Sequence, residues 1–237
     1  MVELSVVVPI YNEKENLYHL HEAITAALKG HIESYEIVLV NDGSTDGSAN
    51  IINELAAKDP AVKGIHFERN CGQTAAIYCG IKRAEGKYIA SIDGDLQTDP
   101  GDILILMKYM ENYDFANGMR VKRRDTLVKK ISSKVGNGVR NWITGDNIQD
   151  TGCPMKVFKR EVAETFFLFE GFHRFLPTIA RMNGFKVTEV PVRHRERMYG
   201  KSKYGVLNRA FVGLMDAIVI GWLRKRMIRY QVREEVR

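Results

Sequence analysis

The chain has 237 residues, of which 45% are hydrophobic and 27% are charged, and this composition is that of an ordinary globular protein. The length suits one domain or one domain with an appendage, and the composition excludes disorder, collagen and coiled coil for the whole chain. The formal charge of +6 is uneven: residues 1–181 carry 22 basic and 24 acidic side chains, whereas residues 182–237 carry 13 and 5. This asymmetry predicts an anionic partner, which could be nucleic acid, a phosphate ligand or a membrane surface.

The sequence shows no sign of export. The N-terminus lacks a basic region and a small-residue cleavage site, and its apolar run ends at Ile10, so it predicts a buried strand and not a signal peptide. The best apolar stretch, residues 211–223, contains a charged residue and is too short to span a bilayer. The three cysteines lack metal-type spacing and suit a reducing cytosol. We therefore expect a cytoplasmic location.

The first half of the chain alternates β-branched runs with helical patterns. Strands are predicted at residues 4–10, 36–40, 62–67, 88–92 and 114–116, and helices at about residues 14–29, 46–58, 73–84 and 101–112. This rhythm predicts an α/β fold with a mostly parallel sheet and helices on both faces. Further along, the patterns predict a helix at residues 172–182, a strand at 186–190 and a helix from about residue 205.

Polar residues follow four of the predicted strands. They read Tyr11-Asn12-Glu13, Asn41-Asp42-Gly43-Ser44, Arg69-Asn70 and Asp93-Gly94-Asp95. Ligands of such sheets bind beyond the carboxyl ends of the strands, so four polar tips together indicate a site. Asn12, Glu13 and Asp42 can hydrogen-bond a base and a ribose. Asn70 precedes the helix that starts near Gln73, where it could bring helix N–H groups to a ligand or cap the helix.

The acidic residues Asp93 and Asp95, after the predicted strand at 88–92, are the strongest local indication of a ligand-binding site. Two carboxylates separated by one small residue can turn toward the same ligand, and such hard oxygen donors suit Mg²⁺ or Mn²⁺ together with a nucleoside diphosphate. The alternative is a surface turn, because Asp-Gly is common in turns. Thr45 and Asp46 are expected to cap the following helix.

Several other kinds of site are disfavoured. No Gly-x-Gly-x-x-Gly follows the first strand, and no paired Cys-x-x-Cys or His-Glu-x-x-His occurs. Gly200-Lys201-Ser202 resembles the end of a P-loop, but the first glycine of that motif is missing. A nucleic-acid-binding module using the basic tail is a third hypothesis, although its usual motifs are absent and the acidic strand tips would repel a phosphate backbone.

The motifs together resemble those of the family 2 glycosyltransferases of GT-A fold, in the branch similar to dolichyl-phosphate mannose synthase and bacterial polyprenyl-phosphate glycosyltransferases. The resemblance covers residues 4–204. The matching segments are Val8-Pro9-Ile10-Tyr11-Asn12-Glu13, residues 40–46, residues 69–73, Asp93-Gly94-Asp95-Leu96-Gln97, Gly118-Met119-Arg120, residues 150–153 and Arg197-x-x-Gly200-x-Ser202-Lys203-Tyr204.

The resemblance implies roles for individual residues. Asp93 would face the nucleotide and the metal, and Asp95 and Gln97 would be the principal metal ligands. Arg120 and Lys203 would contact the donor diphosphate or the acceptor phosphate, and Asp150 would lie by the sugar or acceptor. The residues expected around the nucleotide sugar are Pro9, Tyr11, Asn12, Glu13, Asp42, Asn70, Gln73, Asp93, Gly94, Arg197, Ser202 and Lys203.

The resemblance also implies a reaction: transfer of a sugar, with inversion, from a UDP- or GDP-sugar to a polyprenyl phosphate, either undecaprenyl or dolichyl. A phosphate acceptor is largely dianionic at neutral pH and needs little general-base help. Basic residues within 120–134 and 193–203 suit its binding. The alternative acceptor is a sugar hydroxyl on a polysaccharide or lipid glycan, which would need a base such as Asp150.

The C-terminal helix is predicted to be amphipathic and basic. Its apolar positions recur every three or four residues and a basic cluster follows them: Leu207, Phe211, Leu214, Met215, Ile218 and Trp222, then Arg224, Lys225, Arg226 and Arg229. This pattern is typical of an element lying on an anionic membrane surface. The alternative is a helix packed on the sheet or in a dimer interface. We therefore expect a catalytic domain at residues 1–204, a peripheral membrane helix at 205–237, and either a homo-oligomer or a membrane-protein partner.

Overall fold

The computed structural model describes residues 2–121, 138–193, 206–228 and 234. The chain forms two compact units, one of residues 1–124 and 148–203 and the other of residues 125–147 and 204–237. Residues 138–147 therefore cluster with the C-terminal segment although they are distant from it in sequence. The division into a catalytic domain ending at residue 204 and a separate helix stays a prediction.

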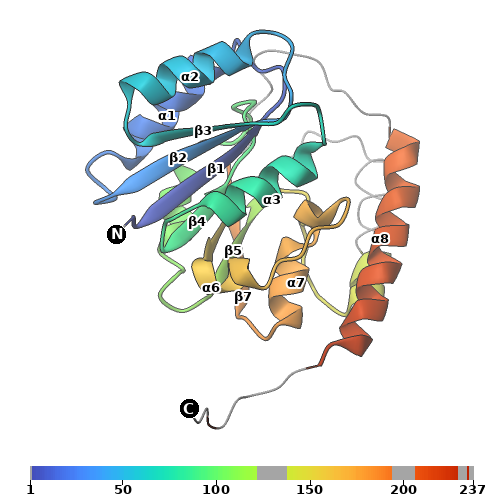
Figure 1. The fold of residues 1–237 in the computed structure, drawn as a ribbon. Coiled ribbons are helices and arrows are strands. Elements are labelled where there is room, and N and C mark those ends of the chain that lie inside the picture. Colours follow the sequence, from blue (N-terminus) through green and yellow to red (C-terminus); the bar gives the residue numbers. More distant parts are fainter. Residues whose placement is uncertain (1, 122–137, 194–205, 229–233, 235–237) are drawn as a thin grey trace. The chain divides into compact units, whose positions relative to one another are not determined.

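The first unit contains a seven-stranded sheet. Its strands are β1 (Leu4–Ile10), β2 (Tyr35–Asn41), β3 (Val62–His66), β4 (Tyr88–Ser91), β5 (Phe115–Arg120), β6 (Lys156–Lys159) and β7 (Val187–Val192). They lie in the order β3-β2-β1-β4-β6-β5-β7 (Figure 1). All neighbours are parallel except that β6 runs antiparallel to both β4 and β5. The predicted α/β fold with a mostly parallel sheet is confirmed, whereas β6 was not predicted.

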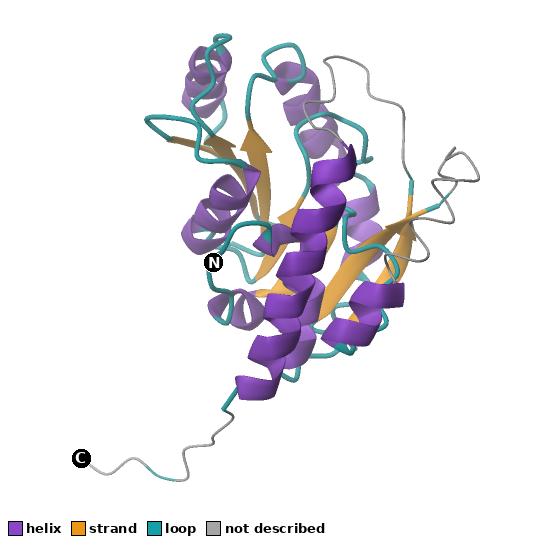
Figure 2. Ribbon diagram, turned by 90° about the vertical axis from the view of Figure 1, so that its right-hand side faces the viewer, coloured by secondary structure: helices purple, strands orange, loops and turns teal. Residues whose placement is uncertain are grey.

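Helices of this unit flank both faces of the sheet (Figures 1 and 2). They are α1 (Leu17–Leu28), α2 (Ser48–Lys58), α3 (Gln73–Arg83), α4 (Asp102–Met107), α6 (Arg160–Glu164) and α7 (Leu176–Met182), with a 3-10 turn, η1, at Phe172–Arg174. The single helix predicted at residues 172–182 is therefore wrong, because the chain forms η1 and then α7. Proline in the first turn of α7 explains the break, since its ring suits a helix start and its nitrogen donates no hydrogen bond.

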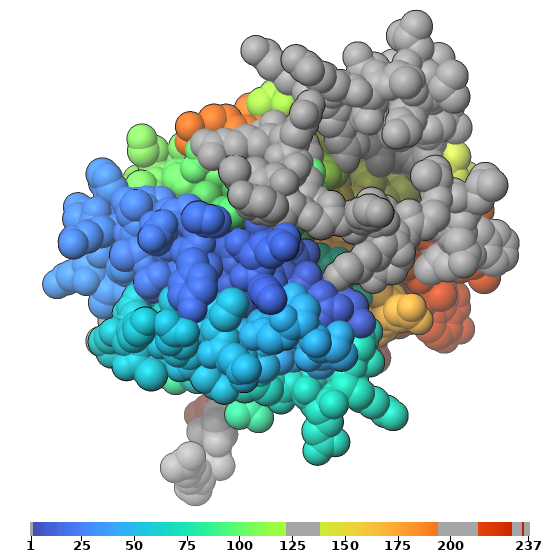
Figure 3. All heavy atoms as spheres, turned by 90° about the horizontal axis from the view of Figure 1, so that it is seen from above, coloured from blue at the N-terminus to red at the C-terminus, as the bar shows by residue number. Residues whose placement is uncertain are grey.

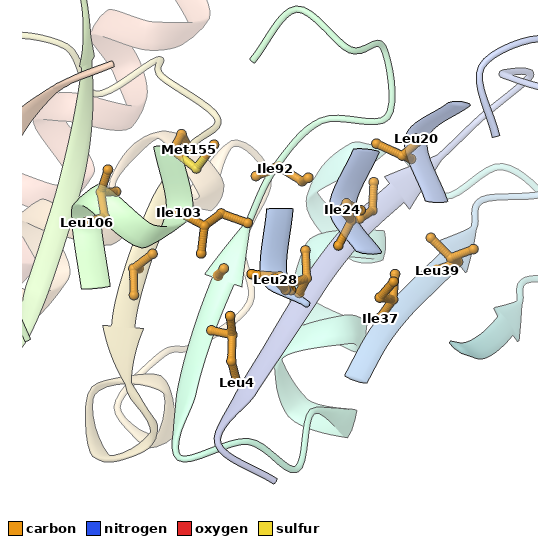
Figure 4. Packing of buried hydrophobic residues seen from close by; sticks show 14 of the residues in the cluster. Leu4, Leu20, Ile24, Leu28, Ile37, Leu39, Ile92, Ile103, Leu106 and Met155 are labelled. Atoms are coloured by element: carbon orange, nitrogen blue, oxygen red, sulfur yellow. The ribbon is translucent and has the colours of Figure 1, made fainter. Parts of the chain in front are cut away.

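One face of the sheet is covered by leucine and isoleucine side chains. Figure 4 shows Leu20, Ile24 and Leu28 of α1 near Ile37 and Leu39 of β2, all of them in one buried cluster. The spacing of three to four residues along α1 places these side chains on one side of the helix, which is why the helix lies on the sheet. Tyr18 Oη of α1 donates to Glu54 Oε2 of α2 at 2.8 Å, and the surfaces of these two helices adjoin in Figure 3.

Helix α3 packs closely against the opposite face of the sheet. A Cβ atom added to Gly80 of α3 would collide with Val7 of β1 and would lie 3.1 Å from Val40 of β2. Further along this unit, Phe115 and Phe158 stack with ring centroids 5.1 Å apart, and Phe166 meets Phe158 edge-on at 5.4 Å. The sheet is therefore packed on both sides, and its carboxyl edge is where polar side chains gather.

The second unit contains α8 (Val206–Arg226) and a helical segment at residues 138–144. Arg224 of α8 donates to the main-chain oxygen of Thr144, and a Cβ atom on Gly221 would lie 2.7 Å from the main-chain oxygen of Ile143. The two helical segments therefore pack closely, and glycine at position 221 permits the approach. Within the described part of the chain, no helix is long and apolar enough to cross a membrane.

Candidate active site at the carboxyl edge of the sheet

The tips of β1 and β2 are joined by hydrogen bonds. Asn12, whose φ is +55°, donates its main-chain N–H to Ser44 Oγ at 3.0 Å and accepts the N–H of Thr45 on Oδ1 at 2.8 Å. Pro9 lies in β1 opposite Val40 of β2. The two tips thus form one surface, and asparagine suits this left-handed position better than most residues.

Two more of the predicted nucleotide-binding residues border this surface. Tyr11 and Glu13 are both half-buried, and Glu13 Oε2 accepts Asn16 Nδ2 at 2.6 Å. The structure therefore brings Tyr11, Asn12 and Glu13 together beyond the end of β1, where a ligand of such a sheet binds.

Asp42 is buried and holds the loop that follows β3. Its Oδ1 accepts the N–H of Cys71 at 2.6 Å, and its Oδ2 accepts the N–H of Gly72 and Asn70 Nδ2, both at 2.9 Å. The adjacent Gly43 has a φ of +65°, and a side chain there would collide with the main chain of this loop. Asp42 and Asn70 therefore shape the loop, and their contact with a nucleotide stays a prediction.

Asp46 binds the first residue of α2 from the position before the N-cap, which is Gly47 and not one of the two predicted capping residues, Thr45 and Asp46. Its Oδ1 accepts both the N–H and the hydroxyl of Ser48 at 3.0 and 2.6 Å, and its Oδ2 accepts the N–H of Lys14 at 3.0 Å. Partial burial favours the protonated acid, but these hydrogen bonds to the carboxylate outweigh it and lower the pKa of Asp46.

Asp93, Asp95 and Gln97 follow β4. Asp95 is 6% exposed and accepts the N–H of Gln97 at 3.1 Å. Leu96, between them, has a φ of +58°, and it is the second non-glycine residue with positive φ in the described chain, after Asn12. Gly94 lies against β1, because a Cβ atom there would approach Ile10 to 2.8 Å. A branched residue such as leucine costs energy in this conformation, so the surrounding packing holds the tip in shape.

The carboxylate of Asp93 is strongly affected by its surroundings. Burial raises the pKa of Asp93 to about 6, and repulsion from Asp95 adds to the effect, while the charges of Lys156 and Arg120 and a hydrogen bond from Gln73 oppose it. Gln73 Nε2 of α3 donates to Asp93 Oδ1 at 2.8 Å. The structure thus brings together Gln73, Asp93 and Asp95, which the sequence had placed in one site.

The residues at this tip fit a divalent cation. Among the residues described, no three His, Cys, Asp or Glu side chains form a group that could hold a metal ion. Asp93 and Asp95 nevertheless follow β4 with one residue between them, and the charge of Asp95 raises the pKa of Asp93, so a cation bound there would favour the charged carboxylates. Mg²⁺ and Mn²⁺ are commonly bound through one or two carboxylates, with waters and substrate phosphates completing the coordination.

Arg120 and Asp150 form a bidentate ion pair. Arg120 Nε lies 2.8 Å from Asp150 Oδ2, Nη2 lies 2.7 Å from Oδ1, and the main-chain N–H of Arg120 also donates to Oδ2 at 3.1 Å. Burial opposes the charged guanidinium, but the bonds and charge of Asp150 raise the pKa of Arg120. The pair is mostly shielded from solvent, and its two parallel charge-assisted hydrogen bonds fix the orientation of the guanidinium.

Three polar residues of the site were missed from the sequence. Asn117 of β5, Lys156 of β6 and Glu189 of β7 all contact the main chain of residues 149–153. The sequence held one indication of Lys156: it directly precedes the apolar residues Val157 and Phe158, which are buried with it. A lysine buried in this way is rare unless it has a partner, so its position beside apolar residues could have indicated a site. Arg197, Ser202 and Lys203, and the basic segment 122–134, lie outside the described residues, so their predicted roles stay predictions.

The sequence and the fold are similar to those of known proteins. The model of the family described as Glycosyl transferase family 2 matches residues 5–167. The undecaprenyl-phosphate 4-deoxy-4-formamido-L-arabinose transferase of Aeromonas hydrophila is 35% identical over 218 residues, covering 91% of this chain and 66% of the relative. The dodecaprenyl-phosphate galacturonate synthase of Rhizobium johnstonii is 36% identical over 225 residues, covering 92% and 66%. The chain thus spans slightly less than two thirds of these relatives.

A solved structure shares the fold. The glucosyl-3-phosphoglycerate synthase of Mycobacterium tuberculosis, in complex with Mn²⁺, uridine diphosphate and glucosyl-3-phosphoglycerate, superposes with a TM-score of 0.68 at 16% identity, covering 96% of this chain and 81% of that one. This likeness supports the GT-A fold. Because the family model matches well over half of the sequence, the chain belongs to glycosyl transferase family 2.

Proposed function

We propose that the protein is an inverting, metal-dependent glycosyltransferase that moves a sugar from a nucleoside-diphosphate sugar to a polyprenyl phosphate at the cytoplasmic face of the membrane. The observation that carries the proposal is the pairing of opposite charges at one sheet edge. Asp93 and Asp95 supply negative charge, and Arg120 and Lys156 supply positive charge close by. A reaction that transfers a sugar from a metal-bound nucleoside diphosphate, which leaves, to a second phosphate brings two anionic groups close together and needs both kinds of charge.

The donor side would use the acidic tip. Asp93, Asp95 and Gln97 would hold Mg²⁺ or Mn²⁺, which when bound supplies Lewis-acid charge neutralisation for the leaving diphosphate. Gln73 fixes the carboxylate of Asp93 through the 2.8 Å hydrogen bond, so this oxygen is oriented before any ligand arrives. Tyr11 and Asn12 would line the nucleotide site. The structural relative with Mn²⁺ and uridine diphosphate is consistent with this donor chemistry. Whether the donor is a UDP-sugar or a GDP-sugar is decided by assaying both.

The acceptor side favours a phosphate over a hydroxyl. Both carboxylate oxygens of Asp150 accept hydrogen bonds from Arg120, at 2.8 and 2.7 Å. A carboxylate stabilised in this way is a weak base, so Asp150 is poorly suited to remove a proton from a sugar hydroxyl. A phosphate dianion needs no such base, and the guanidinium of Arg120 suits a phosphate oxygen. The polyprenyl-phosphate names of the relatives point in the same direction.

The second unit would bind the membrane surface. Trp142 is 85% exposed and Trp222 is 57% exposed, and Ile218 of α8 is nearly half-exposed. The exposed Lys225 and Arg226 follow these apolar residues in the last turn of α8. Exposed tryptophan beside a basic cluster is typical of an element that lies in the interface of an anionic membrane. We therefore propose peripheral attachment through this unit.

The acceptor is tested with radiolabelled nucleotide sugars and lipid extracts containing polyprenyl phosphates, in the presence of Mn²⁺. We expect a lipid-linked product that mild acid releases, because a sugar phosphodiester of this kind is acid-labile. A product stable to mild acid would show transfer to a hydroxyl and would favour the polysaccharide or lipid-glycan alternative.

Membrane attachment is tested by sedimentation with anionic vesicles. Trp142→Ser and Trp222→Ser together should lower the bound fraction several-fold, whereas Tyr109→Ser, which removes an exposed aromatic residue from the first unit, should not. Equal binding of all variants would exclude the second unit as the attachment site.

A further inference from the structure

Polar side chains form a row across four strands of the sheet. Ser91 of β4 is in register with Lys156 of β6, Lys156 with Asn117 of β5, and Asn117 with Glu189 of β7. Residues directly opposite each other on paired strands project from the same face. Ser91, Lys156 and Asn117 are buried. The row therefore crosses the interior at the level of the acidic tip after β4.

Three members of this row hold one irregular segment, residues 149–153. Glu189 accepts the N–H of Gln149 on Oε2 at 2.8 Å and the N–H of Asp150 on Oε1 at 3.0 Å. Asn117 Nδ2 donates to the main-chain oxygen of Asp150 at 2.9 Å. Lys156 Nζ donates to the main-chain oxygens of Thr151, at 3.4 Å, and Cys153. A segment without helix or strand bonds of its own thus has five main-chain groups satisfied by side chains.

The held segment carries the carboxylate that orients Arg120. Because Asp150 binds the guanidinium through two oxygens, any shift of residues 149–153 also shifts the cation. Lys156 itself lies in a buried site next to acidic groups. Burial lowers the pKa of its ammonium group, and the negative charges of nearby groups, among them Asp150 and Asp93, oppose that effect.

We propose that Lys156 is a positioning residue that, with Asn117 and Glu189, fixes residues 149–153 so that Asp150 presents Arg120 to the phosphate of the acceptor. The identity of that acceptor rests on the proposed function, whereas the positioning rests on the hydrogen bonds of the row. Lys156 acts through the main chain and through Asp150 and need not touch either substrate.

The kinetic test compares Lys156→Met with Lys82→Met. Lys82 is exposed whereas Lys156 is buried, but it is matched in its hydrogen bonds, because its Nζ also donates to two main-chain oxygens outside the row, those of Ala163 at 2.9 Å and Glu164 at 3.5 Å. We expect Lys156→Met to lower kcat/KM for undecaprenyl phosphate about 10- to 100-fold, and to change the Kd of UDP or GDP less than threefold. Lys82→Met should stay within twofold of the wild type, and Lys156→Arg should recover part of the loss.

A double-variant cycle separates positioning from general loss of structure. If Lys156 acts through the ion pair, Lys156→Met should cost less than threefold when it is added to Arg120→Ala. Losses that simply multiply, or equal losses in acceptor and nucleotide binding, would overturn the proposal. If Lys156→Met does not fold, Glu189→Gln replaces it in the same cycle, because it removes one of the two acceptors for the N–H groups of Gln149 and Asp150.

Hydrogen exchange tests the row without any assay of transfer. The amides of Gln149 and Asp150 should exchange at least tenfold faster in Lys156→Met than in the wild type, while those of α3 keep their rates. Unchanged exchange at these two amides would overturn the positioning role. Faster exchange in a protein that transfers no sugar to any polyprenyl phosphate would instead retain the row and reject the proposed function.

Discussion

The two halves of the candidate site use their acidic residues differently. Beyond β1, β2 and β3, the carboxylates of Asp42 and Asp46 accept main-chain N–H groups and hold loops in place. Beyond β4 and β5, Asp93 and Asp95 repel each other, and Asp150 binds a guanidinium. The acids of the first half thus stabilise loops, whereas in the second half burial and the neighbouring Asp95 make the charged form of Asp93 unfavourable and Asp150 is bound to Arg120. The first half is therefore expected to affect stability, and the second turnover.

The largest effect should follow Asp95→Ala. Removing a carboxylate that would bind the metal should lower metal-dependent transfer by about 10²- to 10³-fold, as loss of one preorganised electrostatic group does in other enzymes. The midpoint of urea unfolding should change little. The assay compares transfer with and without Mn²⁺, and Asp59→Asn, at the C-terminal end of α2, is the charge-matched control. Metal-dependent transfer that persists would disprove the assignment of Asp95.

Asp42→Ala should destabilise the fold by about 2 to 4 kcal/mol, because the N–H groups of Cys71 and Gly72 lose their buried acceptor. Urea unfolding measures this change. A normal unfolding midpoint combined with lost nucleotide binding would mean that Asp42 contacts the ligand and does not mainly support the loop.

Asp93→Asn should stabilise the metal-free protein at pH 8 by about 1 to 3 kcal/mol. The pKa of Asp93 is raised from the ordinary value of 3.8 to about 6 in the folded state, so the folded state binds its proton more tightly than the unfolded state. Stability should therefore fall as pH rises from about 4 to 6, and the gain from the substitution should vanish below pH 4. Thermal unfolding of both proteins between pH 4 and 8 measures it. A gain that is independent of pH would contradict the burial of a charged carboxylate as its cause.

Asp46→Ala should have the smallest effect, a loss of about 1 kcal/mol, because it removes the acceptor for the N–H and hydroxyl of Ser48, the first residue of α2. The pKa of Asp46 is lowered in the folded state, so this contribution should be present above the ordinary pKa and fade as the pH falls below it. Urea unfolding at pH 7 and pH 3 checks both points. A loss as large as that of Asp42→Ala would remove the distinction between a loop anchor and a helix cap.

The sequence predicted the strands that lead to the site better than the bonds within it. Parallel strands with polar residues after each one require those residues to meet at one edge, so Asn12, Asp42 and Asp93 could be grouped in advance. The partners of Asp42 could not be, because they lie about 30 residues away in a loop whose path depends on Gly43. Likewise, Asp150 was identified by its motif, but its ion pair with Arg120 depends on how the irregular segment at residues 149–153 packs beside the end of β5.

The strand β6 shows most clearly what could not be predicted from local sequence patterns. It is four residues long and has lysine at both ends, so neither its length nor its hydrophobic pattern distinguishes it from a loop. Its place between β4 and β5 follows from long-range antiparallel pairing, which no local pattern encodes. Because β6 was not predicted, Lys156, whose ammonium group donates to the main chain of residues 151 and 153, was not predicted as part of the site either.

The insertion of β6 also has a consequence for the order of folding. During synthesis β1 to β4 emerge before β6, and β4 remains an edge strand with unpaired main-chain groups until residue 159 has been made. β5 cannot join the sheet before that point, because among the described strands it pairs with β6 and β7 and not with β4. Completing this one short strand therefore joins the two parts of the sheet, and the nascent chain is most exposed to edge-to-edge aggregation just before it forms.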